Sequence, residues 1–388
     1  MSYLVIDCET TTFQKGHPYA RRNKLCLVGL YNGIQYRTFD IEYSNNNYLG
    51  NLQQIQRQID EAKILILFNA KFDLAWLHRY GIKFSHRRIW DCQLVDFILS
   101  GQENTYPSLN KVSEAYGLGI KLTNVKEEYW NNGLDTTDIP LDLLEEYLVQ
   151  DLKLTGEIYL RQYQEQKEHS LEMMKLISLA TQDLLVLLEM ETNGIMLDFQ
   201  GMTTASIITN EQINKIKEEL NGYFTGVPTH CLNYNSGDCL SALLYGGTVQ
   251  EQVRKVIGVY KTGHKSGLDR YRVSYVDHVL PRRFEPPRGS QLKKEGFFAT
   301  NEGTLRRIQA KKEDRLILDK LLLLSKLEKL NNTYYVGLQE LHKEKDWEDN
   351  IIHGQFNQVV AHTGRLSSSS PNLQNFPPEI DKFIQTRF

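Results

Sequence analysis

The stretch Tyr3–Thr11, YLVIDCETT, places two acidic residues at the end of a short apolar run. A run such as Tyr3 to Ile6, bounded by polar residues, is typical of a buried strand. Because strand side chains alternate between faces, Asp7 and Glu9 are expected to project from the same face. Two like charges side by side repel, and hard oxygen ligands suit magnesium or manganese. The pair therefore indicates a metal site, although surface acids or a hydrogen-bonding pair in a loop give the same short pattern.

Strand and helix signals alternate through the first 160 residues. Further apolar runs at 25–31 and 64–68 predict buried strands. Helical patterns are expected over three segments, the last of them opened by Asp138 and Pro140 as cap and first-turn residue. These segments are 52–62, 74–80 and 141–160. The alternation predicts an α/β domain.

The chain changes character from about residue 168, where long helices are expected. The apolar helix 171–193 should end at Gly194, and amphipathic patterns cover 203–224 and 304–343. Between Gln250 and Thr300 the helical pattern breaks up, and 11 Lys or Arg face 5 Asp or Glu. This segment is the most basic part of the chain.

Length and composition bound the class of protein. A chain of 388 residues suggests two or three domains, and 41% hydrophobic with 24% charged residues is ordinary for a folded soluble protein. A net charge of −3 does not indicate a nucleic-acid binder, although such binders can concentrate cations on one face. The five cysteines are scattered without a C-x-x-C pair, which argues against a zinc site or a disulfide framework and for a reducing compartment. No signal peptide or membrane span is expected, so we predict a soluble, cytoplasmic protein.

Three more acid-bearing or aromatic positions could join the first pair. Asp73 follows the predicted strand 64–68 at the start of a helix, where an N-cap is the simplest role for an aspartate. Tyr147 and Asp151 are four apart on a predicted helix and so share one face. A tyrosine with its tip at the surface and a solvated aspartate would explain that pair equally well.

Taken in order, D-x-E, N-x-x-x-D and Y-x-x-x-D resemble the three motifs of the DEDDy 3′-5′ exonucleases. The matching positions are Asp7, Glu9, Asn69, Asp73, Tyr147 and Asp151. The resemblance implies a ribonuclease-H-like 3′-5′ exonuclease domain over residues 1–165. It also implies that the four carboxylates hold two divalent ions, Mg²⁺ or Mn²⁺, which suits in-line hydrolysis of a phosphodiester. By the same resemblance Tyr147 orients the attacking water, and Asn69 contacts the terminal nucleotide.

A second resemblance, to the family A DNA polymerases of the bacterial DNA polymerase I type, covers the rest of the chain. It is carried by LLEMETNGIMLD, NYNSGDCLSALLYGG, SKLEKLNNTYYVGL and AHTGRLSSSSPNLQNFP, at 187–198, 233–247, 325–338 and 361–377. It implies a mainly helical thumb over 166–347, with a basic insertion at about 250–300, and the beginning of a palm over 348–388. The DNA-binding residues so implied are Thr333, Tyr334, Arg365, Asn372 and Gln374.

The basic insertion and nearby lysines leave alternatives open. The insertion could hold duplex DNA or a processivity factor, as in a phage-type enzyme, or be a solvated loop. Lys326 and Lys329 would follow the DNA backbone or belong to an ordinary solvated helix face.

In the polymerase family, residues beyond Phe388 would carry the palm carboxylates and the fingers. The resemblance therefore implies the N-terminal subunit of a split, phage-like replicative polymerase, or a truncated fragment of one. Such a chain would bind primer-template DNA, proofread, and need a C-terminal partner with the fingers and remaining palm to polymerise nucleotides. The alternatives are a free-standing 3′-5′ exonuclease with a helical DNA clamp, and a non-catalytic subunit that only clamps DNA.

Overall fold

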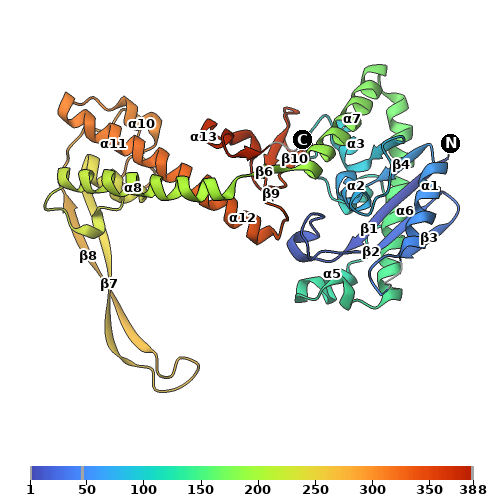
Figure 1. The fold of residues 1–388 in the computed structure, drawn as a ribbon, viewed down its shortest axis with the longest axis horizontal. Coiled ribbons are helices and arrows are strands. Elements are labelled where there is room, and N and C mark those ends of the chain that lie inside the picture. The colour runs from blue at the N-terminus through green and yellow to red at the C-terminus, as the bar shows by residue number, and fades with distance from the viewer. Residues whose placement is uncertain (1, 45–47, 386–388) are drawn as a thin grey trace. The chain divides into compact units, whose positions relative to one another are not determined.

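The computed structural model describes residues 2–44 and 48–385 (Figure 1). The chain forms two compact units. The first comprises the chain up to Phe199 together with the chain from Leu338, and the second comprises Gln200–Gly337. None of the helices in the described ranges is long and apolar enough to cross a membrane. The predicted mixed fold, an α/β domain with a mainly helical region, is confirmed.

A five-stranded mixed sheet forms the centre of the first unit. Its order is β3-β2-β1-β4-β5, with β1 antiparallel to β2 and parallel to β4. The strands are β1 (Tyr3–Thr10), β2 (Leu25–Tyr31), β3 (Tyr36–Asp40), β4 (Ile64–Leu67) and β5 (Arg88–Asp91). The central strands are apolar and almost wholly buried, as the short apolar runs predict.

Helices flank this sheet. They are α1 (Leu49–Glu61), α2 (Ala70–Arg79), α3 (Cys92–Leu99), α4 (Leu109–Ala115), α5 (Asn124–Glu128), α6 (Leu141–Glu165) and α7 (Leu171–Asn193). The long helix α6 lies across β1 and β2, where Gly29 makes room for it. A Cβ atom at Gly29 would come within 2.7 Å of Leu152 and 2.8 Å of Leu148. Gly29 also pairs with Asp7 across the β1–β2 ladder, so this close approach brings α6 down beside that acid.

Several predicted boundaries move. Strand β1 continues to Thr10, so Asp7 and Glu9 lie within the strand and share its same face. Helix α7 ends at Gly194 (φ 59°), as predicted. The predicted cap role of Asp138 is wrong: Pro140 precedes α6 without a side-chain cap. Asp138 instead accepts a hydrogen bond from the Asp135 backbone N–H in the 3-10 turn Thr136–Asp138. This local hydrogen bond replaces one to the first turn of α6.

The C-terminal segment returns to the first unit as small sheets and short helices. Strands β6 (Ile195–Leu197), β9 (Ile351–Ile352) and β12 (Ile384–Gln385) form one sheet, and β10 (Gln355–Asn357) pairs with β11 (Ser367–Ser369). Helices α12 (Gly337–Lys345) and α13 (Pro378–Asp381) belong to the same segment. Trp347 is 1% exposed and packs against His17, while Asp346 pairs with Arg21. These contacts attach residues 338–385 to the sheet domain.

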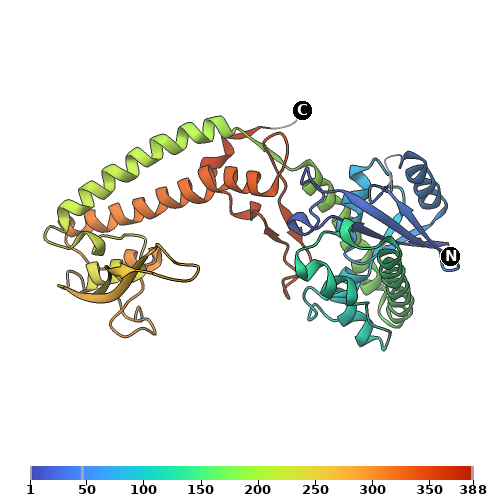
Figure 2. The ribbon, with the colours of Figure 1, turned by 90° about the horizontal axis from the view of Figure 1, so that it is seen from below.

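The second unit contains two long helices, shorter helices and a β-ribbon. Figure 2 shows α8 (Phe199–Tyr223) alongside α11 (Lys312–Lys329). Ser206 of α8 donates a 2.7 Å hydrogen bond to Asn331 Oδ1, which lies just after the end of α11. The helix predicted over 304–343 is interrupted, because Ile308 is extended and buried between α10 (Glu302–Arg307) and α11. The following π-helical turn, Leu330–Val336, leads into α12.

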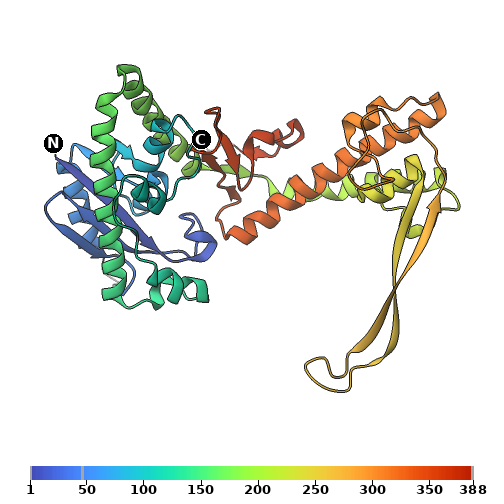
Figure 3. The ribbon, with the colours of Figure 1, turned by 180° about the vertical axis from the view of Figure 1, so that it is seen from behind.

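The basic insertion is an antiparallel ribbon up to Leu280, and irregular chain from there to residue 300. Strands β7 (Gly247–Val259) and β8 (Asp269–Leu280) pair over their whole length and project as a twisted ribbon (Figure 3). Its base is buried at Val249 and Leu280 against helix α9 (Gly237–Tyr245), whereas most of its length is exposed. The ribbon therefore depends on its base for its attachment to the second unit.

The approach of α6 to the sheet makes a stability prediction. Gly29→Ala should destabilise the protein by about 1–3 kcal/mol, because the methyl group overlaps Leu148 and Leu152. Thermal denaturation of the two proteins measures the change. Gly50→Ala in α1 is the control, since no atom lies within 4 Å of its Cβ position and alanine is the better helix former. An equal effect of both substitutions would contradict the proposed close packing.

Candidate metal centre

Three carboxylates from two distant segments meet beside the sheet. Asp7 and Glu9 come from β1 and Asp151 from α6, and one oxygen of each lies within 4.8 Å of the others. Glu9 and Asp151 are buried, whereas Asp7 is partly exposed. The strand period places the first two on one face, and the crossing of α6 over β1 supplies the third.

Asp73 is held next to this group by the backbone of β1. Its Oδ1 atom accepts a 3.0 Å hydrogen bond from the Cys8 amide, between Asp7 and Glu9. Asp73 lies in the first turn of α2 and is 2% exposed. The alternative role as an N-cap is thereby excluded, since Asn69 occupies the cap position.

The electrostatics of the cluster show an excess of negative charge. Burial, followed by the charge of Asp151, raises the pKa of Asp7 to about 7. Burial and the charge of Asp7 raise the pKa values of Glu9 and Asp73 well above their usual range. Within the described part of the chain, Asp151 Oδ1 is buried and has no hydrogen-bond partner. A positive ion would relieve both the repulsion and the unpaired oxygen, so these residues fit a divalent metal.

Lys121 is a member of the cluster that sequence reasoning missed. Its ammonium group donates to Asp151 Oδ2 and lies 4.3 Å from the centre of the Tyr147 ring. Burial lowers the pKa of Lys121, but the charges of Asp151 and the neighbouring acids outweigh it and leave the pKa raised. Lys121 lies between α4 and α5, and its neighbours in the sequence carry no signal that separates it from a surface lysine.

Tyr147 stands one turn before Asp151 on α6. It is 3% exposed, and the Trp130 ring contacts it edge-on at 5.5 Å between centroids. Burial raises the pKa of Tyr147, so its hydroxyl stays protonated. The predicted neighbourhood of Tyr147 and Asp151 on one helix face is present, with both side chains inside the unit.

Asn69 is fixed by a residue that the motifs did not include. Asn69 has a left-handed backbone (φ 62°), and its backbone N–H donates a 2.9 Å hydrogen bond to Asp91 Oδ1. The backbone N–H of Ala70 donates to Asp91 Oδ2 at 3.0 Å. Asp91 also caps α3 by accepting from Gln93. The exposed Asn69 side chain borders an open cavity of about 350 Å³ whose lining includes Phe72.

The candidate DNA-binding residues fall into two groups in different compact units. Thr333 is exposed and Tyr334 is 7% exposed in the π-helical turn of the second unit. In the first unit Arg365 is exposed. The side chains of Asn372 and Gln374 form hydrogen bonds within their own loop. Asn372 Oδ1 accepts from the Gln374 amide at 3.1 Å, and Gln374 Nε2 donates to the Leu366 carbonyl at 3.2 Å.

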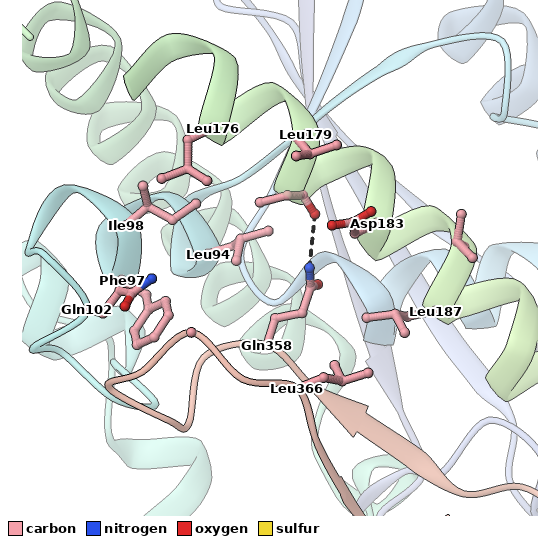
Figure 4. A pocket seen from close by; sticks show the side chains of 13 residues that line it. Leu94, Phe97, Ile98, Gln102, Leu176, Leu179, Asp183, Leu187, Gln358 and Leu366 are labelled. Carbon is pink, nitrogen blue, oxygen red and sulfur yellow. Dashed lines mark hydrogen bonds between the residues drawn. The ribbon is translucent and has the colours of Figure 1, made fainter. Parts of the chain in front are cut away.

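The loop that carries Arg365 also covers an apolar cavity of about 290 Å³ (Figure 4). Leu176, Leu179 and Leu187 of α7 line one side of it, and Leu366 lies opposite. Gln358 crosses the cavity and donates a 3.0 Å hydrogen bond to the Ala180 carbonyl. This hydrogen bond attaches the start of the loop to α7 and so helps to fix the residues that follow, including Arg365.

The countercharge role of Lys121 predicts a metal-dependent stability. In a chelating buffer Lys121→Met should lose up to about 3 kcal/mol of stability, because removal of one partner leaves buried charge uncompensated. Added Mg²⁺ should recover most of that loss and so raise the melting temperature of this variant more than that of the parent. The exposed Lys126→Met is the matched control. An equal response of all three proteins to Mg²⁺ would contradict the assigned role.

Comparisons with known proteins agree with this geometry. Residues 1–161 match the family model of 3′-5′ exonucleases, and residues 274–388 match that of DNA polymerase family A. DNA polymerase I of Synechocystis sp. is 28% identical over 323 residues, which are 83% of this chain and 28% of that relative. The DNA polymerase of Bacillus phage SP01 is 22% identical over 98% of this chain and 43% of the relative. The chain thus spans less than half the length of these curated relatives.

Among solved structures, the chain resembles the POL domain of Pol1 from M. smegmatis, in complex with DNA primer-template and dNTP. The TM-score is 0.65 at 17% identity, over 97% of this chain and 52% of that chain. This likeness is one of fold. The two family models and the DNA polymerase I relatives together support a family A DNA polymerase with an N-terminal 3′-5′ exonuclease domain.

Proposed function

We propose that the carboxylate cluster is a DEDDy-type 3′-5′ exonuclease centre that removes nucleotides from a DNA 3′ end during proofreading. The observation that carries this proposal is the convergence of Asp7, Glu9 and Asp151, with one buried Asp151 oxygen unpaired among the described residues. The match of residues 1–161 to the exonuclease family supports the same reaction.

Asp7, Glu9, Asp73 and Asp151 would hold two divalent ions, Mg²⁺ or Mn²⁺, because hard cations prefer carboxylate oxygens. When bound, such ions supply an activated water and stabilise the leaving oxygen of the phosphodiester. The Cys8 amide orients Asp73. Glu9, Asp73 and Asp151 are buried, whereas the partly exposed Asp7 leaves the centre open to solvent.

Tyr147 and Lys121 would act on the water and on Asp151. The Tyr147 hydroxyl is protonated and can therefore donate a hydrogen bond to the attacking water while accepting another. Lys121 fixes one Asp151 oxygen and leaves the other free for a ligand. Asn69, held by Asp91, would contact the terminal nucleotide from the rim of its cavity.

The remaining part of the chain would hold primer-template DNA without reading its sequence. Thr333 and Tyr334, with Lys326 and Lys329, would contact one part of the duplex. Arg365, Asn372 and Gln374 would contact another. Contacts to phosphate and sugar position a duplex and carry no sequence information, as a replicative enzyme requires. Arg365 is exposed, and its guanidinium group can make a charge-assisted contact to a phosphate.

Nucleotide addition would need further polypeptide that supplies the fingers and remaining palm. We propose a partner subunit for this role, in the cytoplasm and, if the gene is a phage gene, in the bacterial host. The similarity to the DNA polymerase of Bacillus phage SP01 supports the phage setting. The match of residues 274–388 to the polymerase family favours this assembly over a free-standing exonuclease with a DNA clamp.

The exonuclease proposal predicts the effect of single substitutions. With Mg²⁺ and a labelled single strand, Asp7→Ala should slow 3′ removal more than about 100-fold, since even outer partners of metal ligands cost 10–100-fold. Tyr147→Phe should slow it about 10- to 100-fold by the same reasoning. Asp142→Ala, an exposed acid on the same helix, is the control and should leave the rate unchanged. Full activity of Asp7→Ala would refute the assigned centre.

Arg365→Ala should weaken binding to primer-template DNA and reduce the slope of log affinity against log salt by about one contact. The exonuclease rate on a short single strand should stay as in the parent, because the change is outside that centre. Arg57→Ala, an exposed residue on α1, is the control. An unchanged salt slope in Arg365→Ala would exclude a phosphate contact at this residue.

The partner-subunit proposal is tested by capture of the tagged chain from cells that express its complete gene neighbourhood. A separate co-purifying chain that restores primer extension supports it. Primer extension by a single longer polypeptide refutes it, and so does exonuclease activity with no extension under any reconstitution.

A further inference from the structure

The base of the β7–β8 ribbon carries a second cluster of metal-ligating side chains, outside the carboxylate centre. It consists of His230, Glu251 and His278, whose candidate ligand atoms lie within 4.8 Å of one another. His230 belongs to the 3-10 turn Thr229–Cys231, Glu251 to β7 and His278 to β8. All three belong to the second compact unit. We propose that these residues form a zinc site that fastens the ribbon to the unit.

Both imidazoles approach the same carboxylate oxygen. His278 Nε2 is 2.8 Å and His230 Nδ1 is 3.7 Å from Glu251 Oε2. Ligands about 2.0–2.1 Å from a tetrahedral zinc ion lie about 3.4 Å apart, so the observed separations fall on either side of that value. A small change in side-chain torsion would therefore admit the ion without movement of the backbone.

The ribbon register explains why Glu251 and His278 meet. Val249 pairs with His278, and Glu251 pairs with Val276, so Glu251 and His278 are diagonal neighbours on one face. The side chains of Glu251, His278 and His230 are 38%, 21% and 27% exposed. This partial exposure lets an ion enter from solvent while the adjacent strands hold its ligands.

The donor set favours zinc over the ions of the carboxylate centre. Imidazole nitrogens suit zinc and related transition metals, whereas Mg²⁺ prefers oxygen and keeps several waters. The Sγ atom of Cys231 lies 3.4 Å from His230 Nδ1, so a soft sulfur atom borders the site as well. The scattered cysteines argued against a zinc site, but that argument applies to cysteine motifs and does not reach a site built from histidines 48 positions apart in the sequence.

A metal at this position has a structural consequence. An isolated two-stranded ribbon is at best marginally stable in water, and most of this one is exposed. Three ligands from three elements would tie both strands to the preceding turn, and the binding free energy would stabilise that attachment. The role is independent of the proposed exonuclease reaction, which uses residues of the first unit.

The test uses the full chain, freed of metal by chelation and then kept in excess Mg²⁺ so that the carboxylate centre is supplied. Zn²⁺ alone is titrated by calorimetry, and we expect one equivalent to bind tightly. His230→Ala and His278→Ala should each weaken this binding more than about 100-fold, beyond the cost of losing an outer-shell partner. His264→Ala, an exposed histidine elsewhere in the β7–β8 hairpin, is the matched control.

Glu251→Gln separates a metal ligand from a hydrogen-bond partner. The amide can still accept a hydrogen bond from His278 but is a poor zinc ligand, so it should preserve the fold and lose the ion. Co²⁺ in place of zinc gives a second readout, because tetrahedral coordination absorbs visible light strongly and an all-oxygen octahedral site does not. Zinc should also slow tryptic cleavage of the ribbon in the parent and not in Glu251→Gln.

The result that overturns the proposal is Zn²⁺ binding of equal stoichiometry and affinity in the parent, His278→Ala and Glu251→Gln, or no zinc binding by the parent. Exonuclease activity should be unchanged in Glu251→Gln. Loss of the zinc equivalent with activity intact supports the site, and loss of activity in Asp7→Ala with zinc binding intact keeps the two questions separate.

Discussion

The central constraint on the structure is electrostatic: four carboxylates lie close together in a mostly buried site, where negative charge is unfavourable. Burial raises the pKa values of Asp7, Glu9, Asp73 and Asp151, and the charges of neighbouring acids raise those of the first three further. A cluster without positive charge would take up protons or move apart. Lys121 supplies one charge from a loop, and divalent ions would supply the rest. The same electrostatic need that stabilises the cluster makes it suited to a metal-dependent reaction.

Contacts elsewhere in the first unit fix the positions of these side chains. The close approach of α6 at Gly29 brings Tyr147 and Asp151 to β1. The backbone N–H of Cys8, also in β1, holds Asp73 by a hydrogen bond. Asp91 fixes the turn that presents Asn69. Each contact joins segments far apart in the sequence, so the centre is a property of the packed domain and of no single motif.

The C-terminal segment is bound to this domain by similar polar and aromatic contacts. Lys71 pairs with Glu191 at 2.5 Å and also donates to the Phe356 carbonyl, which links α2, α7 and β10. His17 and Trp347 pack together, and burial, with the charges of His353 and Lys345, lowers the pKa of His17 to about 4. A neutral His17 at physiological pH suits this apolar contact. The polymerase-like residues 338–385 therefore fold as an extension of the exonuclease domain.

The sequence alone indicated three strands of the central sheet, the helices α6 and α7 and the spacing of the acids, because these depend on local periodicity and on the order of motifs along the chain. It indicated the α/β class, the six positions that match the exonuclease motifs and the resemblance to polymerases. Tertiary structure decided the rest. Lys121 and Asp91 act through contacts 30 and 22 residues away in the sequence, and Asp138 prefers a nearby amide to the end of α6. Most of the basic insertion is a paired ribbon, and its register brings His278 beside Glu251 and close to His230 of the preceding turn. Such contacts leave no pattern in the local sequence, because they form between segments that are distant in the chain and become neighbours only in the folded protein.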